Sequence, residues 1–191
     1  QPGSTFKVFT LAAAIDQGLP LTTTFNSPSQ MTFDMADYAN CPGEGNFSSN
    51  PYPVGNSTTS GNKNLYTGTR ESVNTFYVRL VQFTGVCAPY TLAKKMGISL
   101  TDPAHERVPS FTLGPVDVSP LEMAEAYATF GARGKHCDSR PVTEIVGLKN
   151  PLSEKFSVLR PSIVPGLLES LIYNRHRQAA DPRGRRARQA H

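Results

Sequence analysis

The stretch that most constrains the fold is the first seventeen residues, which carry a nearly unbroken apolar run. We predict one helix here, because Pro2 and Gly3 favour a turn, Ser4 stands where a helix begins, and Gly18 is a typical C-terminal stop. The apolar positions are Phe6, Val8, Phe9, Leu11, Ala12, Ala13, Ala14 and Ile15. A helix with almost no polar face is buried on most sides, so we expect it to lie inside the domain.

Ser4 and Lys7 are the polar exceptions at the start of this helix, and their spacing puts them on one face. A serine hydroxyl is a weak nucleophile until a base takes its proton, and a partly desolvated lysine has a lowered pKa that suits this task. A helix N-terminus also offers free N–H groups to an oxyanion. The spacing alone equally fits an N-cap serine and a solvent-reaching lysine. It recurs at Ser60 and Lys63, in a Gly/Asn-rich loop, where we interpret it as chance.

A second polar pair, Ser72 and Asn74, lies at the start of a predicted amphipathic helix. The helical pattern is carried by Val73, Phe76, Tyr77, Leu80 and Val81. On a regular helix, Ser72 and Asn74 would diverge, whereas on an extended lead-in they would point to the same side. Asn74 equally fits a helix cap beside a solvent-exposed serine. The residues alone leave both interpretations open.

The rest of the chain predicts further elements around these two helices. Residues 19–70 are polar and read mostly as loop, with one or two short strands around 30–33. We predict a short helix at 89–96 and another that begins with a capping box at Ser119, Pro120 and Glu122. Alternation at 141–146 predicts a strand. After the capping box, a stripe is predicted to face the core: Met123, Ala126, Tyr127 and Phe130.

Charge and composition exclude several classes of function. The net charge is +4, but residues 174–191 contain six arginines and one aspartate, so the remainder carries about −1. We therefore expect no nucleic-acid partner and interpret the basic tail as an end without a selected role, rather than a basic arm. The three cysteines lack Cys-x-x-Cys spacing and the four histidines do not cluster with them, so we expect no metal and no cofactor. Their redox state stays open.

Three stretches together carry a family resemblance. Pro2-Gly3-Ser4-Thr5-Phe6-Lys7 with its apolar run closely resembles the active-serine helix of penicillin-binding transpeptidases. Ser72-Val73-Asn74 matches the family's Ser-x-Asn motif, whereas a competing Ser48-Ser49-Asn50 has no helix behind it. Residues 112–130 resemble a segment of class A, high-molecular-mass penicillin-binding proteins. The resemblance covers about residues 1–148, and no lysine in the chain is followed by the Thr-Gly or Ser-Gly of the family's third motif.

The resemblance implies an α+β fold of the β-lactamase/transpeptidase type. We expect it to be incomplete, with the helical half, few short strands and most of the central antiparallel sheet missing. Residues 1–150 would form a partial transpeptidase domain and 151–191 a poorly ordered tail. We also expect this chain to be a fragment, with any membrane anchor in a preceding part, and to come from a bacterial protein of the cell envelope.

The implied activity is that of a serine D,D-transpeptidase. Its partners would be peptidoglycan stem peptides ending in D-Ala-D-Ala and β-lactam antibiotics. Ser4 would be the nucleophile, Lys7 its base and Ser72 a proton relay, while Asn74 would hold the substrate amide. Without the third motif, we expect this chain alone to be inactive or nearly so. Three alternatives stay open: a serine β-lactamase, a β-lactam sensor that binds without turnover, and a nucleic-acid binder acting through the arginine tail.

Overall fold

The computed structural model describes residues 1–140, 146–147 and 158–159. The chain divides into two compact units, Gln1–Ser139 and Arg140–His191. In the second unit, β5 (Val146–Gly147) pairs antiparallel with β6 (Val158–Leu159). The strand predicted at 141–146 lies outside the described residues except for Val146, and the tail predicted to be poorly ordered lies outside them except for β6. Within the described residues, no helix has the length and apolarity needed to cross a membrane.

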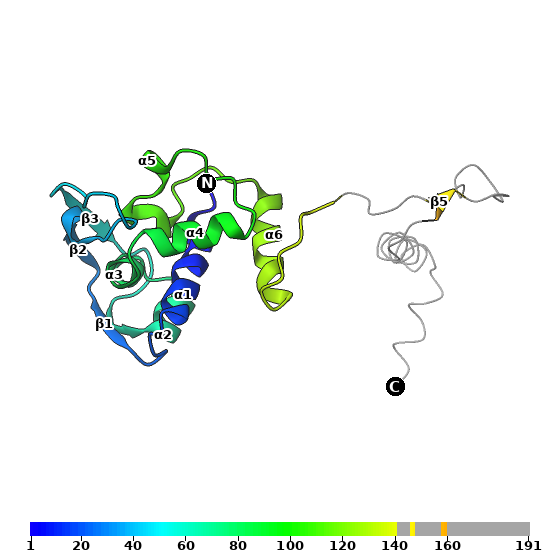
Figure 1. The fold of residues 1–191 in the computed structure, drawn as a ribbon. Helices are drawn as coiled ribbons and strands as arrows, with labels where there is room; N and C mark the ends of the chain where they lie inside the picture. The colour runs from blue at the N-terminus through cyan, green and yellow to red at the C-terminus, as the bar shows by residue number, and fades with distance from the viewer. Residues whose placement is uncertain (141–145, 148–157, 160–191) are drawn as a thin grey trace, which may run out of the picture. The chain divides into compact units, whose positions relative to one another are not determined.

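The N-terminal helix forms as predicted, but its first turn is tighter. A 3-10 turn, η1 (Gly3–Phe6), leads directly into α1 (Lys7–Asp16), which is coloured blue in Figure 1. Gln17 closes the helix, and Gly18 then adopts a φ of +83°, a left-handed conformation that favours glycine. Helix α1 packs against α3 and α4 (Figure 1), but it is less buried than its composition predicts: Phe9, Ala13 and Ala14 are buried, whereas Ile15 is exposed.

The remaining helices surround α1. They are α2 (Leu65–Arg70), α3 (Asn74–Thr84), α4 (Cys87–Lys95), α5 (Pro103–Glu106), α6 (Pro120–Gly131) and the 3-10 turns η2 (Met35–Asp37) and η3 (Pro109–Leu113). Both α3 and α4 pack against α1, and η3 contacts η1 and α3. The helices predicted from sequence periodicity at 73–83 and 89–96 are therefore confirmed.

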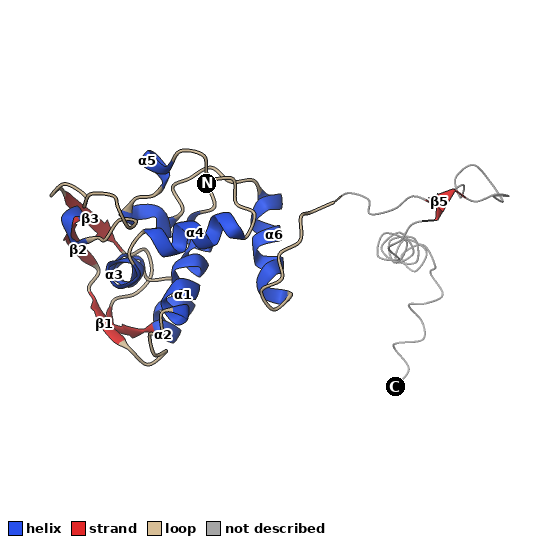
Figure 2. Ribbon diagram, viewed as in Figure 1, coloured by secondary structure: helices blue, strands red, loops and turns tan. Residues whose placement is uncertain are grey.

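The polar tract between α1 and α2 contains more strand than its composition predicts. Strand β1 (Thr24–Ser27) pairs antiparallel with β4 (Gly61–Asn64), and β2 (Gln30–Asp34) with β3 (Pro51–Gly55). Figure 2 shows these short strands in red beside the blue helices. The strand expected at 30–33 is confirmed, and so is the fold class: a helix-rich α+β domain with few, short strands and an incomplete sheet.

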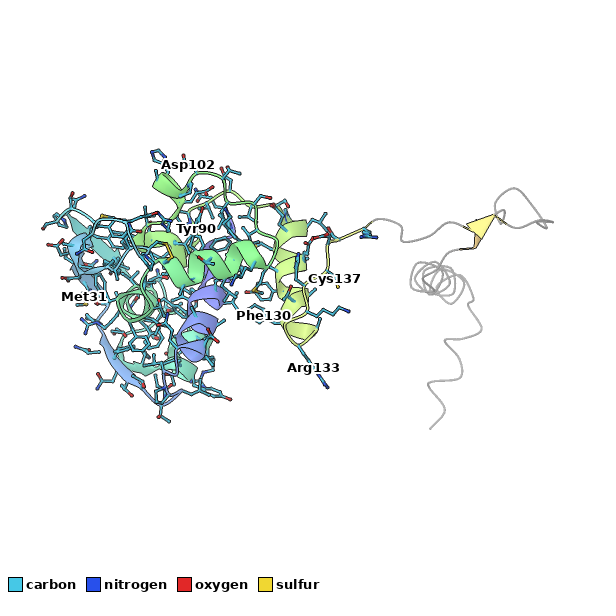
Figure 3. The ribbon with its side chains drawn as sticks, in the orientation of Figure 1. Met31, Tyr90, Asp102, Phe130, Arg133 and Cys137 are labelled. Carbon is cyan, nitrogen blue, oxygen red and sulfur yellow. A yellow bond between two sulfur atoms is a disulfide. The ribbon has the colours of Figure 1, made fainter. Side chains whose placement is uncertain are left out.

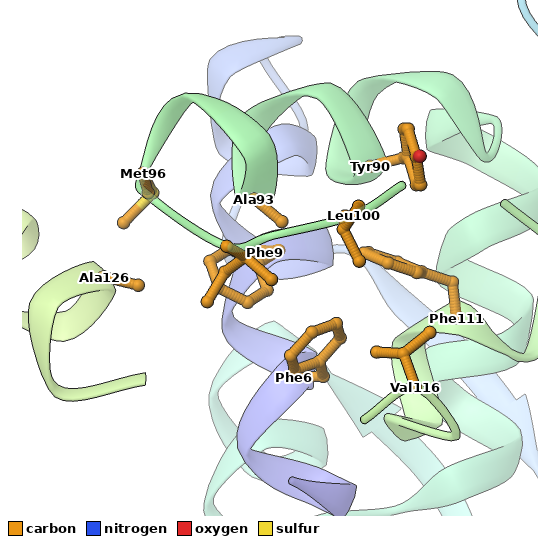
Figure 4. Close-up of a cluster of buried hydrophobic side chains, with 10 residues drawn as sticks. Phe6, Phe9, Tyr90, Ala93, Met96, Leu100, Phe111, Val116 and Ala126 are labelled. Atoms are coloured by element: carbon orange, nitrogen blue, oxygen red, sulfur yellow. The ribbon is translucent and has the colours of Figure 1, made fainter. Parts of the chain in front are cut away.

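Aromatic packing joins η1 and α1 to the rest of the unit. Phe6 and Phe9 are fully buried, with ring centroids 5.0 Å apart in an edge-to-face arrangement, and Phe111 of η3 lies 5.0 Å from Phe6. Tyr90 and Ala93 of α4 complete the same cluster (Figure 4). Edge-to-face pairs add to the stabilisation from apolar burial, so the start of α1 is held firmly in place.

Helix α6 begins as predicted but buries less of its stripe than expected. Ser119 accepts from the Glu122 backbone N–H, and the Glu122 side chain accepts from that of Ser119, which completes the capping box. Ala126 is buried, but Tyr127 and Phe130 are 43% and 41% exposed, so the prediction that they face the core is wrong.

Tyr127 donates its hydroxyl to the Thr5 carbonyl oxygen at 2.9 Å, and Phe130 borders a groove with a volume of about 780 Å³. Its α1 wall includes Ala12 and Ala13, whose short side chains do not fill the space between the helices. Phe130 is labelled on α6 in Figure 3.

A disulfide resolves the redox state that the sequence left open. Cys41 in the polar tract is bonded to Cys87 at the start of α4, and Cys137 is a free, exposed thiol. The bridge fixes a loop with little regular structure to a packed helix.

Candidate active site

The four residues singled out in the sequence meet at one atom, the Nζ of Lys7. This nitrogen lies 3.1 Å from the Ser4 Oγ, 3.0 Å from the Ser72 Oγ and 2.7 Å from the Asn74 Oδ1. It also donates to the Ser72 carbonyl oxygen at 2.8 Å. Residues more than sixty positions apart in the chain thus form a single hydrogen-bonded cluster.

Two glycines position the turn that carries Ser4. Gly3 adopts a φ of +58°, and its N–H donates to the carbonyl oxygen of Gly114 at 3.3 Å. A Cβ atom added to Gly114 would lie 2.3 Å from the Gly3 carbonyl oxygen, which is closer than any side chain tolerates. The backbones at residues 3 and 114 therefore approach this closely only because Gly114 lacks a side chain.

Ser72 adopts a strained backbone conformation that aims its side chain at Lys7. Its φ is +53°, in the left-handed region that non-glycine residues seldom occupy. The turn is held by hydrogen bonds from the N–H of Ser72 to the Thr69 carbonyl and from the N–H of Val73 to the Gly68 carbonyl. Val73 is extended, and it directly precedes α3. This geometry puts the side chains at positions 72 and 74 on one side, as the extended lead-in predicts, and excludes the interpretation of Asn74 as a cap.

Asn74 is fixed from both ends of its amide. Its Oδ1 accepts from Lys7, and its Nδ2 donates to the Gly55 carbonyl of β3 at 2.9 Å. The N-cap position of α3 is Val73, and the free N–H of Thr75 in the first turn donates to the Oδ1 of Asn56 at 2.9 Å. Sequence reasoning missed Gly55 and Asn56, because both lie about twenty residues upstream in the polar tract and no local capping pattern links them to α3.

Burial sets the charge state of Lys7. The side chain is 4% exposed, and desolvation lowers its pKa from 10.5 to about 8. The Tyr77 ring, another residue that sequence reasoning assigned only to the core, lies 5.4 Å from Nζ. The Tyr77 hydroxyl is 2.7 Å from the Thr69 Oγ1, so the ring is anchored. Within the described residues, no carboxylate pairs with this lysine.

The competing sequence motifs do not form such a cluster. Lys63 makes a salt bridge to Glu71, and Ser60 is fully on the surface. The backbone N–H of Asn50 donates to the carboxylate of Asp34, in the loop before β3. Both motifs are accounted for by local structure.

The family model of the penicillin binding protein transpeptidase domain matches residues 1–185. The chain belongs to this family. It is 30% identical over 159 residues to penicillin-binding protein 1A of Mycobacterium tuberculosis, a match that spans 76% of this chain and 18% of the relative. It is 32% identical over 108 residues to penicillin-binding protein 4 of Bacillus subtilis, with 53% of this chain and 16% of the relative covered.

Solved structures give the same class of fold. The penicillin-binding protein PonA1 from Mycobacterium tuberculosis superposes with a TM-score of 0.54 at 26% identity, over 70% of this chain and 34% of the other. The imipenem acyl-enzyme of penicillin-binding protein A from M. tuberculosis superposes with a TM-score of 0.51 at 24% identity, over 67% and 31%. This chain thus spans less than a fifth of the curated relatives and about a third of the solved chains.

Proposed function

We propose that the protein to which this chain belongs is a serine D,D-transpeptidase that cross-links peptidoglycan stem peptides and is acylated by β-lactams. The observation that carries the proposal is the buried Lys7 amine, which touches the hydroxyls of both Ser4 and Ser72. Family membership supports the reaction class, and a stem peptide ending in D-Ala-D-Ala is the substrate that this class implies. The bacterial relatives support a place in the cell envelope.

The hydrogen bonds of Lys7 suit a base for Ser4. The Ser72 carbonyl and the Asn74 Oδ1 have no proton to give, so each occupies one N–H of the amine. The two serine hydroxyls face the third position of the amine. This position is an N–H when the lysine is charged and the lone pair when it is neutral. A pKa of about 8 leaves an appreciable neutral fraction near neutral pH, and that form can accept a proton from Ser4.

The proposed reaction has two acyl-transfer steps. The Ser4 Oγ attacks the carbonyl carbon of the penultimate D-Ala while Lys7 takes the hydroxyl proton. The tetrahedral intermediate collapses, the bond to the terminal D-Ala breaks, and Ser72 relays a proton to the leaving amine. The acyl group on Ser4 then passes to an amine of a neighbouring stem peptide. Asn74 holds the donor's amide and restrains Lys7 throughout.

This chain supplies only one of the two hydrogen-bond donors that we expect for the oxyanion. The backbone N–H of Ser4 supplies one donor at the start of the helix, and in the family the third-motif strand supplies the other. No such motif occurs in the 191 residues. Losing one oxyanion donor costs on the order of 10² to 10³ in rate. We therefore propose that this chain alone reacts slowly with β-lactams and does not turn over stem peptides.

The test is acylation of the purified chain by labelled penicillin, read by intact mass. We expect slow formation of one adduct that is absent from Ser4→Ala and retained in Ser60→Ala, which carries the same change in the competing Ser-x-x-Lys sequence. A well-folded chain that never acquires an adduct would overturn the assignment of Ser4. An adduct that hydrolyses within minutes would instead indicate a β-lactamase. A lasting adduct on a parent protein without transpeptidation would indicate a sensor.

A further inference from the structure

Three side chains converge at the end of α6, outside the Ser4–Lys7 cluster. Glu125 projects from the helix, while His136 and Asp138 lie on the segment that follows it, on either side of Cys137, which is labelled in Figure 3. The His136 Nε2 is 3.3 Å from the Glu125 Oε1 and 3.4 Å from the Asp138 Oδ1. All three atoms lie within 4.8 Å of one another.

These separations match the edge of a zinc coordination tetrahedron. Zinc binds imidazole nitrogen and carboxylate oxygen at roughly 2.0–2.2 Å, so two ligand atoms at tetrahedral corners are about 3.3–3.5 Å apart. The distances from the His136 Nε2 to the Glu125 Oε1 and to the Asp138 Oδ1 fall in this range, and both end on the same imidazole nitrogen. Neither contact has the length of a charge-assisted hydrogen bond to a single carboxylate, about 2.7–2.9 Å, so a purely direct contact would need one N–H shared between both carboxylates. A shared cation explains the geometry better than two ion pairs.

The imidazole is oriented by its other nitrogen. The Thr129 Oγ1 lies 3.3 Å from the His136 Nδ1, and its hydroxyl donates to the Glu125 carbonyl oxygen, also at 3.3 Å, so a proton on Nδ1 would find an acceptor in Thr129. In the tautomer with its proton on Nδ1, the Nε2 lone pair faces the two carboxylate oxygens, and a cation between the three atoms would bind all of them. A ligating histidine held through its second nitrogen in this way is the usual arrangement at metal sites.

The surrounding backbone holds the carboxylates in place and leaves one side open. The Ser139 N–H donates to the Glu125 Oε2 at 3.0 Å, which leaves Oε1 facing His136. On the closed side lies Gly97, where an added Cβ would come within 2.7 Å of the Glu125 Oε1 and 2.8 Å of the His136 Cε1. The Asp138 side chain is 80% exposed, so an ion can enter from that side and keep a water as its fourth ligand.

We infer that Glu125, His136 and Asp138 form a zinc site that ties the segment after α6 back to the helix. The sequence predicts no metal site, because its cysteines and histidines do not cluster. Two of these three ligands are carboxylates, and one lies eleven positions before His136. Only the turn that ends α6 brings them together.

The test is calorimetric titration of the metal-stripped, full-length chain with zinc chloride, in a Cys137→Ser background so that the free thiol does not compete. We expect one ion bound per chain, with at least tenfold weaker binding in Asp138→Asn and in His136→Gln. The matched control is Asp102→Asn, which removes the carboxylate from the exposed Asp102–His105 pair, where the 2.7 Å contact is an ordinary direct one. That variant is expected to bind zinc like the parent.

Because Asp138 is largely exposed, its replacement does not threaten folding, and the outcome with this variant can be interpreted even if His136→Gln misfolds. Zinc should also raise the midpoint of thermal unfolding of the parent chain but not that of Asp138→Asn. Absence of stoichiometric binding would overturn the inference, and so would equal binding by Asp138→Asn. Either result would mean that the three side chains contact one another directly and hold no metal ion.

Discussion

At the scale of single residues, the chemistry of the site depends on whether Lys7 carries a proton. Burial lowers its pKa to about 8, so the amine is mostly charged below pH 7 and mostly neutral above pH 9. We expect the Lys7 ε-carbon resonance to titrate with a midpoint near 8, and acylation of Ser4 to speed up over the same range. Lys7→Arg identifies the resonance and should abolish acylation, because a guanidinium stays charged. A midpoint above 10 would rule out this lysine as a base near neutral pH.

Ser72 offers a second test at this scale, because its backbone and its hydroxyl make separable contributions. Its φ of +53° is strained for serine and unstrained for glycine. We expect Ser72→Gly to be more stable than Ser72→Ala by about 1 kcal/mol, since both lack the hydroxyl and differ in the left-handed penalty. Urea denaturation measures the difference. Equal stability, or a more stable alanine variant, would show that the turn relaxes and stores no strain.

At the scale of elements, local signals in the sequence predicted helices α1, α3, α4 and α6, but neither the short helices α2 and α5 nor which elements pack together. The apolar run predicts α1, and the capping box predicts the start of α6, because each signal lies within the helix that it predicts or at its first turn. Strands β1 and β4 were missed because Thr24 and Asn64, which are paired, stand forty residues apart in polar surroundings. The prediction that Phe130 faces the core is wrong because an apolar stripe shows which face of a helix is apolar, but not whether another element covers that face.

In the candidate site, too, local sequence predicts some features, and others depend on contacts between distant residues. The sequence predicted Ser4 and Lys7 from one turn of helix, but left Ser72 and Asn74 undecided between a cap and a cluster. That choice depends on the left-handed turn at Ser72 and on the Gly55 carbonyl, which only the folded chain brings to Asn74. No periodicity encodes either feature.

The capping box of α6 gives the prediction at this scale. Removing an N-cap hydroxyl costs about 1 kcal/mol, so we expect Ser119→Ala to lower the free energy of unfolding by that amount, with Ser60→Ala unchanged as the control. The Ser119 side chain is the main cause that lowers the pKa of Glu122 to about 2. A lowered acid pKa stabilises the fold above pH 4.5, and this stabilisation is lost as the pH falls toward 2. Glu122→Gln should therefore flatten the pH dependence of unfolding in that window.

At the scale of the whole molecule, the first unit has a well-packed interior and an incompletely covered exterior. Ile15 of α1, Leu21 and Tyr66 are 47%, 46% and 73% exposed, and they line one shallow apolar groove. Apolar surface that stays in water contributes nothing to folding. The apolar surface that stays exposed makes the disulfide an informative test of what stabilises this unit.

The bridge between Cys41 and Cys87 closes a loop across 46 positions and joins the polar tract to α4. Closing a loop of this size stabilises a fold by roughly 2–4 kcal/mol, chiefly by restricting the unfolded chain. We expect the double variant Cys41→Ser/Cys87→Ser to lose that amount in urea denaturation and to unfold largely at 37 °C, whereas Cys137→Ser, which removes an exposed free thiol, should unfold like the parent. Reducing agent should lower the stability of the parent to that of the double variant and leave the double variant unchanged. If the parent in its oxidised form and the double variant unfold at the same urea concentration, the β-strand pairs and the packing of Phe33, Tyr38 and Val54 against α3 hold the polar tract, and the bridge adds nothing to the fold.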